Sequence, residues 1–189
     1  MNDIVFYWVA WACWIWAACM MEKGKIRTQI AVFSLIAIIC SNYTCSIADY
    51  SVNVAIIFFL LLSIYCIITK HLAKQIYLVF IAAAAALGYA SIVLLSIFDP
   101  VLVILPINIM TTIFLLIIAS IVAKQLIDKL FIIFFSTAIG EIIIGIIFGQ
   151  LRLQSEIGMN QYLTRIAVPF AILAMFQAFK TMLMKNKYI

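Results

Sequence analysis

Residues 130–149 read LFIIFFSTAIGEIIIGIIFG, a run in which Glu141 is the only ionisable side chain. An α-helix needs about 20 mainly apolar residues of this kind to cross the hydrocarbon core of a bilayer. The rest of the chain is similar, since 68% of its 189 residues are hydrophobic, 10% are charged and the mean hydropathy is +1.26. Soluble domains carry roughly 45–50% apolar and about 25% charged residues. The composition therefore excludes a soluble globular domain and a disordered chain, and indicates an integral membrane protein.

Six further apolar stretches predict six more spanning helices in one integral membrane domain, residues 1–189. The seven expected spans are 4–21, 28–47, 52–69, 75–98, 101–123, 130–149 and 166–184. At about 20 residues each they take up about 140 residues, which leaves no room for a soluble nucleotide-binding, kinase or protease module. We expect an all-α, polytopic membrane helix bundle.

The positions of the basic residues predict the direction of these helices, because cytoplasmic loops carry an excess of Lys and Arg. With the N-terminus outside, only Arg152 and Arg165 fall on the outer side. The others fall inside: Lys23, Lys25, Arg27, Lys70, Lys74, Lys124, Lys129, Lys180, Lys185 and Lys187. An even number of spans breaks this alternation. We therefore expect about seven transmembrane helices, N-out and C-in, in a multi-pass protein of the cell membrane.

Glu141 lies near the midpoint of the sixth expected span. A carboxyl group at that depth is costly unless it is protonated, paired or hydrated. On a helix, Thr137, Glu141 and Gly145 share one face, and a row of small and polar residues packs against other helices. Lys180, in the seventh expected span, either reaches the inner membrane surface or pairs with Glu141.

The fifth expected span carries polar residues that can meet Glu141. Glu141 lies about as far after the turn near residues 126–127 as Thr112 lies before it, which predicts a similar depth in antiparallel neighbours. Pro106 removes a helical hydrogen bond and can free a carbonyl beside Asn108. The candidate intramembrane polar cluster is Asn108, Thr111, Thr112, Thr137 and Glu141. Two interpretations stay open: a structural cluster that holds two helices in register, or a proton- or cation-linked site.

The first expected span contains all four tryptophans of the chain. Tyr7, Trp11 and Trp14 follow at helical spacing and form a candidate aromatic face that extends to the middle of the membrane. Interfacial aromatic belts do not reach that depth. We interpret this face as a packing seam within the bundle or, alternatively, as a ridge that binds lipid or a partner.

Motifs typical of enzymes are absent from the sequence, including HExxH, GxSxG and the P-loop. His71 is the single histidine, and the five cysteines form neither a CxxC pair nor a metal-ligand spacing. We therefore expect no catalytic residues, no cofactor, no metal and no nucleic-acid partner.

The N-terminal part resembles a known family. The residues that carry the resemblance are Phe6-Tyr7-Trp8, Trp11, Trp14-Ile15-Trp16, Met21-Glu22-Lys23, Arg27 and Ile38-Ile39-Cys40-Ser41. This pattern, within about the first forty-five residues, is similar to the YphA-like small membrane proteins of bacilli and related Gram-positive bacteria. The resemblance implies an integral plasma-membrane protein of unassigned activity and carries over no catalytic residue.

The sequence thus predicts a non-enzymatic integral membrane protein with a structural or accessory role in the cell envelope. The alternative is a small proton- or cation-linked transporter or channel centred on Glu141. The expected partners are membrane lipids and either a membrane protein or a second copy of the chain.

Overall fold

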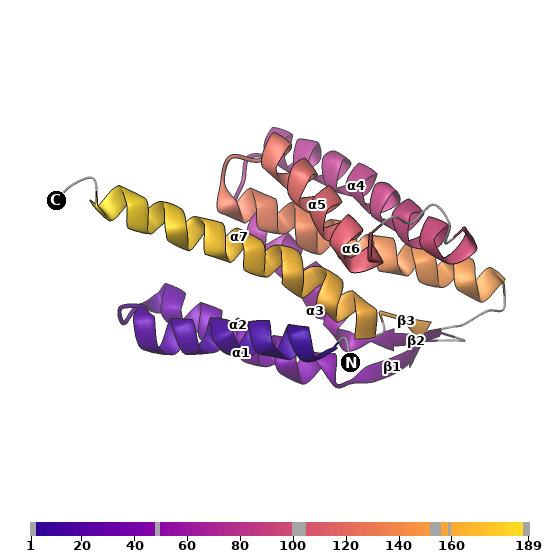
Figure 1. The fold of residues 1–189 in the computed structure, drawn as a ribbon, viewed down its shortest axis with the longest axis horizontal. Helices are drawn as coiled ribbons and strands as arrows, with labels where there is room; N and C mark the ends of the chain where they lie inside the picture. The colour runs from indigo at the N-terminus through magenta and orange to yellow at the C-terminus, as the bar shows by residue number, and fades with distance from the viewer. Residues whose placement is uncertain (1–2, 48–49, 100–104, 152–155, 159, 187–189) are drawn as a thin grey trace.

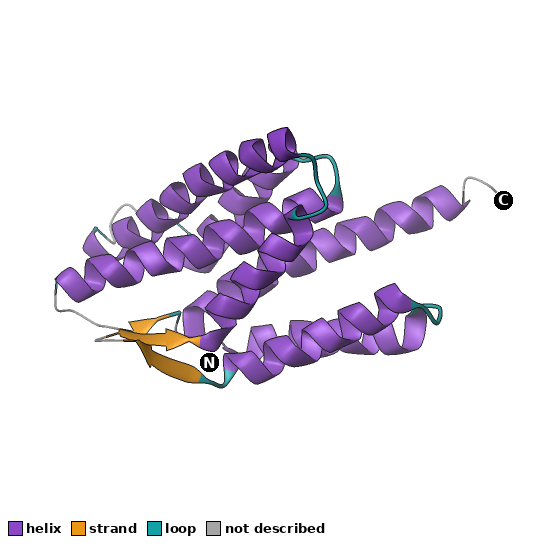
Figure 2. Cartoon of the chain, turned by 180° about the vertical axis from the view of Figure 1, so that it is seen from behind, coloured by secondary structure: helices purple, strands orange, loops and turns teal. Residues whose placement is uncertain are grey.

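A computed structural model describes residues 3–47, 50–99, 105–151, 156–158 and 160–186. Within these ranges the chain forms seven α-helices and one small sheet (Figures 1 and 2). The helices are α1 Asp3–Met20, α2 Lys25–Ser41, α3 Val54–Ile67, α4 Leu72–Phe98, α5 Ile107–Val122, α6 Leu126–Gln150 and α7 Asn160–Asn186. The strands are β1 Thr44–Ile47, β2 Tyr50–Asn53 and β3 Glu156–Ile157. The all-α fold class is confirmed, and the sheet is an addition that we did not predict.

Two helices, α4 and α6, are long and apolar enough to cross a membrane by length and composition. Shorter apolar helices cover Ile4–Met20, Val54–Ile67 and Ile107–Val122. The expected spans 4–21, 75–98 and 130–149 correspond to α1, α4 and α6, although α4 and α6 begin a few residues earlier than expected.

The boundary of the second expected span, 28–47, was wrong. Helix α2 ends at Ser41, and residues 44–47 form β1 instead of continuing the helix. Both Ser41 Oγ and Asn42 Nδ2 donate to the carbonyl of Ile38, at 2.7 and 3.1 Å. Such side chains compete with the backbone and favour the end of a helix.

The start of the third expected span, 52–69, was also wrong, because residues 52–53 belong to β2. Asn53 caps α3: its Oδ1 accepts a hydrogen bond from the Ala55 amide at 2.8 Å. Its Nδ2 donates to the Ser41 carbonyl at 3.2 Å, which ties the end of α2 to the start of α3.

Pro106 does not interrupt a helix, contrary to the prediction for the span 101–123. It is the N-cap residue of α5, so it frees no carbonyl inside the helix. Pro is tolerated at the start of a helix because the first amides have no intrahelical acceptor. Residues 101–104 of that expected span lie outside the described residues.

The seventh helix begins earlier than the expected span 166–184. Residues 160–165, expected in a loop, form the first turns of α7, and Arg165 is buried inside the fold. Hydropathy misplaced this boundary because an arginine beside polar residues is typical of a loop. The correction moves Arg165 from an outer loop into the helix bundle.

Consecutive helices run in alternate directions, so the turns lie at two ends (Figure 1). At the sheet end, β1 pairs antiparallel with β2, and β2 pairs parallel with β3. The opposite end, called the basic end here, holds the turns at 21–24, 68–71 and 123–125. There Asp128, buried in the first turn of α6, forms ion pairs with Lys70 at 3.4 Å and Lys74 at 2.5 Å.

Helix α6 is the centre of the packing, since it contacts α3, α4, α5 and α7. It passes closest to α4 at Gly140, where an added Cβ would overlap the Tyr89 ring and lie 3.2 Å from the Ala86 carbonyl oxygen. A glycine is therefore required by the close approach of the two backbones, as is common in membrane helix pairs.

Gly140→Ala should lower the free energy of unfolding in detergent by about 1–3 kcal/mol, because the fully buried Tyr89 ring must shift and the Ala86 carbonyl also lies close. Gly24→Ala is the control, since the nearest atom to its Cβ is the Glu22 carbonyl at 4.0 Å. The control should change stability by less than about 1 kcal/mol. Equal thermal unfolding curves for the two variants would contradict the close α4–α6 contact.

Candidate functional site

The small and polar row on α6 faces the inside of the fold, as its spacing predicted. Thr137, Glu141 and Gly145 are all buried. A Cβ added at Gly145 would meet the Ile157 side chain of β3, and one at Gly149 would meet the Tyr50 ring of β2. The row therefore contacts α7 and the sheet, and the glycines let the strands pack directly on the end of α6.

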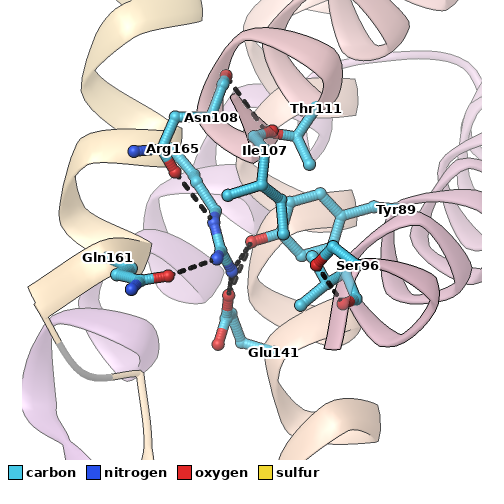
Figure 3. A network of polar contacts seen from close by, with 9 residues as sticks. Tyr89, Ser96, Ile107, Asn108, Thr111, Glu141, Gln161 and Arg165 are labelled. Carbon is cyan, nitrogen blue, oxygen red and sulfur yellow. Dashed lines mark hydrogen bonds and ion pairs between the residues drawn. The ribbon is translucent and has the colours of Figure 1, made fainter. Parts of the chain in front are cut away.

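Glu141 is held by a cation and a hydroxyl group from two other helices (Figure 3). Nη1 of Arg165 on α7 lies 3.1 Å from Oε1 of Glu141. The hydroxyl of Tyr89 on α4 donates to the same oxygen at 2.5 Å. The side chains of Glu141 and Arg165 are 10% and 6% exposed, so water screens this ion pair little.

Arg165 uses its remaining donors to hold α5 and its own helix. Its Nε donates to Oδ1 of Asn108 at 3.2 Å, and its Nη2 donates to Oε1 of Gln161 at 2.6 Å. Nη1 also lies 3.5 Å from the Tyr89 hydroxyl. One guanidinium thus joins α4, α5, α6 and α7. We call Tyr89, Asn108, Glu141, Gln161 and Arg165 the arginine cluster.

The structure brings two members of the predicted cluster, Asn108 and Glu141, to one site. Asn108 belongs to the arginine cluster, but it reaches Glu141 through Arg165. Thr111 and Thr112 are buried, and their hydroxyls donate to carbonyls one turn earlier in α5. Thr137 does the same within α6, where its hydroxyl donates to the Ile133 carbonyl at 2.8 Å. Each of these threonine hydroxyls donates a hydrogen bond within its own helix. The hydrogen-bond partners of Glu141 come from other helices.

Sequence reasoning missed Arg165 and Tyr89. Arg165 lies outside the expected spans, and Tyr89 lies in the fourth expected span, 75–98, where nothing in the sequence sets it apart. One signal was available: a mid-membrane carboxylate needs a cation, and the basic residues at the edges of or within the seventh expected span are Arg165, Lys180 and Lys185. The side chain of Lys180 lies outside the described residues.

The predicted aromatic face does not coincide with the buried face of α1. The buried positions are Phe6, Ala10 and Ala17, whereas Trp11 is 46% exposed. The rings of Trp11 and Trp14 contact each other edge to face, 5.8 Å between centroids. Tyr7 anchors the helix by donating to Asn42 Oδ1 at 3.0 Å. Burial therefore contradicts a packing seam at Trp11, and a lipid- or partner-facing ridge stays a prediction.

The chemistry open to the arginine cluster is limited by its own bonds. Oε1 of Glu141 accepts from both a guanidinium and a phenol, and both donors complement a negative charge on that oxygen. Within the described ranges, no group of three or more His, Cys, Asp or Glu side chains is placed to hold a metal ion. The arginine cluster therefore pairs one acidic with one basic side chain and has one exposed polar edge, at Gln161.

A family model described as "YphA-like integral membrane protein" matches residues 2–188. The chain belongs to this family. The resemblance seen in the first forty-five residues therefore extends over nearly the whole chain, and the assignment to an integral membrane protein is confirmed. No curated protein and no solved structure matches the chain.

A double-mutant cycle should reveal how strongly the pair holds α6 to α7. Arg165→Met leaves a buried carboxylate unpaired and Glu141→Leu leaves a buried guanidinium unpaired, so each should cost about 3–5 kcal/mol of unfolding free energy. The double variant should recover more than half of that loss, because both charges are gone. Unfolding in mixed detergent micelles measures all four proteins. Additive losses would show that the two side chains are not coupled.

Proposed function

We propose that this protein is a non-enzymatic, multi-pass component of the cell membrane with an accessory or structural role in the cell envelope. The observation that supports the proposal is the state of Glu141. Its carboxylate oxygen is occupied by Arg165 and Tyr89, and the cluster links four helices. A residue used in this way holds the fold together and does not serve as a free acid or base.

In this proposal all seven helices cross the membrane, with the sheet end outside and the basic end in the cytoplasm. The alternating helix directions support it, together with the basic residues gathered at one end. Those in described parts of the chain are Lys23, Lys25, Arg27, Lys70, Lys74, Lys124, Lys129 and, by backbone position in α7, Lys180 and Lys185. An excess of Lys and Arg on one side is typical of cytoplasmic loops. The three-stranded sheet then extends the short helices α2 and α3 toward the outer surface.

The partners that fit this role are membrane lipids and, through the exposed Trp11 edge of α1, a membrane protein or a second copy of the chain. Exposed aromatic side chains provide large contact areas at low entropic cost. No nucleic-acid partner is proposed.

A proton- or cation-linked transporter centred on Glu141 is the second candidate. One observation favours it: the arginine cluster runs from buried Glu141 through Arg165 to exposed Gln161 at the sheet end. Intramembrane carboxylates commonly mark ion pathways. Transport requires this pair to open during each cycle, whereas a structural role requires it to stay closed.

Fusion proteins test the orientation. A green fluorescent protein fused after Ile189 or after Lys70 should fluoresce in the cytoplasm, and alkaline phosphatase at the same sites should be inactive. A fusion after Asp99 should give the opposite pair of results, because residue 99 lies at the sheet end. Alkaline phosphatase activity after Ile189 would contradict the C-in orientation.

Reconstitution separates the two candidate functions. In liposomes loaded with a pH-sensitive dye, the wild type should give no more proton, Na⁺ or K⁺ flux than protein-free vesicles. Glu141→Gln, which keeps the shape of the side chain, should give the same result. Flux in the wild type that Glu141→Gln abolishes, with an unchanged elution profile of the variant, would establish the transporter instead.

A further inference from the structure

A cavity of about 270 Å³ lies inside a ring of five helices, away from the arginine cluster. Around this ring α1 packs on α2, α2 on α3, α3 on α6, α6 on α7, and α7 on α1. None of the five members of the arginine cluster lines it. The cavity is therefore a second feature of the bundle that the ion pair does not explain.

The cavity is long and narrow. Helix α2 lines it from Ile26 to Ala37 and α3 lines it from Phe58 to Cys66, which at 1.5 Å per residue are lengths of about 16 and 12 Å. These lengths suit one extended hydrocarbon chain lying along the two helices.

The lining excludes water as the occupant. Six phenylalanines contribute to the wall: Phe6, Phe33, Phe58, Phe59, Phe134 and Phe170. Of the polar groups, the Ser34 hydroxyl already donates to the Ala31 carbonyl at 2.9 Å, and Gln29 Nε2 donates to the Tyr65 hydroxyl at 3.2 Å. A buried water needs two or more polar partners, and apolar cavities stay dry.

The two ends of the cavity differ. At the end nearer the sheet, Phe59 contacts both Phe6 and Phe134, with ring centroids 6.4 and 5.3 Å apart. At the other end the lining reaches Ile26 and Tyr65, next to Lys23 in the α1–α2 turn and Lys25 at the start of α2. An anionic group is thus complemented by charge only at the basic end.

The wall between α2 and α3 is one side chain thick. Phe33 contacts Phe58 and Tyr65, with centroids 6.5 and 5.8 Å apart, and the Gln29–Tyr65 hydrogen bond closes the same seam. All four side chains line the cavity, and Gln29 and Tyr65 are also exposed on the outer surface of the bundle. A chain in the surrounding bilayer can enter here by rotation of these side chains alone.

We propose that this cavity holds one acyl chain of an anionic phospholipid from the leaflet at the basic end, inserted between α2 and α3. The headgroup lies beside Lys25 at the start of α2, and the chain extends past Phe33 toward Phe59. The inference rests on the proposed function, which includes membrane lipids among the partners. It adds the class of lipid and the place where that lipid binds. If the cavity were empty, the side chains that line it would lose van der Waals contacts along its whole length. An alkyl chain in the cavity restores these contacts.

Native mass spectrometry of the full-length protein, purified with its co-extracted lipids, tests the site with two neighbouring substitutions. Leu62 lines the cavity, whereas Leu61 is 61% exposed on the outer face of the same helix. The wild type and Leu61→Trp should retain one anionic phospholipid per protein. Leu62→Trp fills the space and should reduce retention at least tenfold. Equal retention by the two variants, or no retained phospholipid on folded wild type, would overturn the proposal.

Photocrosslinking on the wild type keeps the test valid if Leu62→Trp fails to fold. Vesicles carry phosphatidylglycerol with a diazirine in one acyl chain, or phosphatidylcholine with the same chain. Labels should map to cavity residues such as Cys13 and Cys66, several-fold more with phosphatidylglycerol. Labels confined to outward residues such as Leu61, or equal labelling by both lipids, would contradict the site or its charge preference. Ion flux in the reconstitution assay would instead refute the proposed function and leave this result unaffected.

Discussion

The ion pair between Glu141 and Arg165 is the interaction on which the sheet end of the bundle depends. In an apolar surrounding neither charge is stable alone, so each requires the other to be placed within hydrogen-bond distance. Tyr89 and Asn108 complete the donors and acceptors around the pair. Because these groups come from four different helices, satisfying one charge fixes the relative positions of α4, α5, α6 and α7. The glycines of α6 permit the close packing that this arrangement requires.

The same constraint makes the two ends of the molecule different. At the sheet end, polar bonds and strand pairing hold the helices together. At the basic end, α6 is held to the α3–α4 turn by Asp128 and its lysines, while α2 meets α3 across a thin wall of aromatic side chains. The apolar cavity lies beside this wall, where the Gln29–Tyr65 hydrogen bond joins α2 to α3. A bundle that is held at one end and looser at the other suits a protein that receives a lipid chain from the bilayer.

Part of the candidate site was predictable from periodicity and depth. Glu141 was identifiable because a carboxylate in the middle of an apolar helix needs a partner, and its row with Thr137 and Gly145 faces inward because small residues allow close packing. Asn108 was predicted through its depth in the neighbouring helix. Arg165 was not predicted to be part of the site, because an arginine next to polar residues has the hydropathy of a loop. Its burial is possible only because it pairs with Glu141. The cavity left no trace in the sequence, since its lining comes from five helices.

The sequence by itself determined that the chain belongs in a lipid bilayer, how many helices it forms and that successive helices alternate in direction. Composition and the length of each apolar run decide whether a segment is stable in lipid. It also determined family membership through the pattern around Trp11 and Arg27. The tertiary structure alone decided which cation meets Glu141, that residues 44–47 pair with residues 50–53 as strands, and where space remains between helices. Pairing of side chains distant in the chain depends on helix rotation and crossing. These follow from the packing of all seven helices at once, and no single segment encodes them.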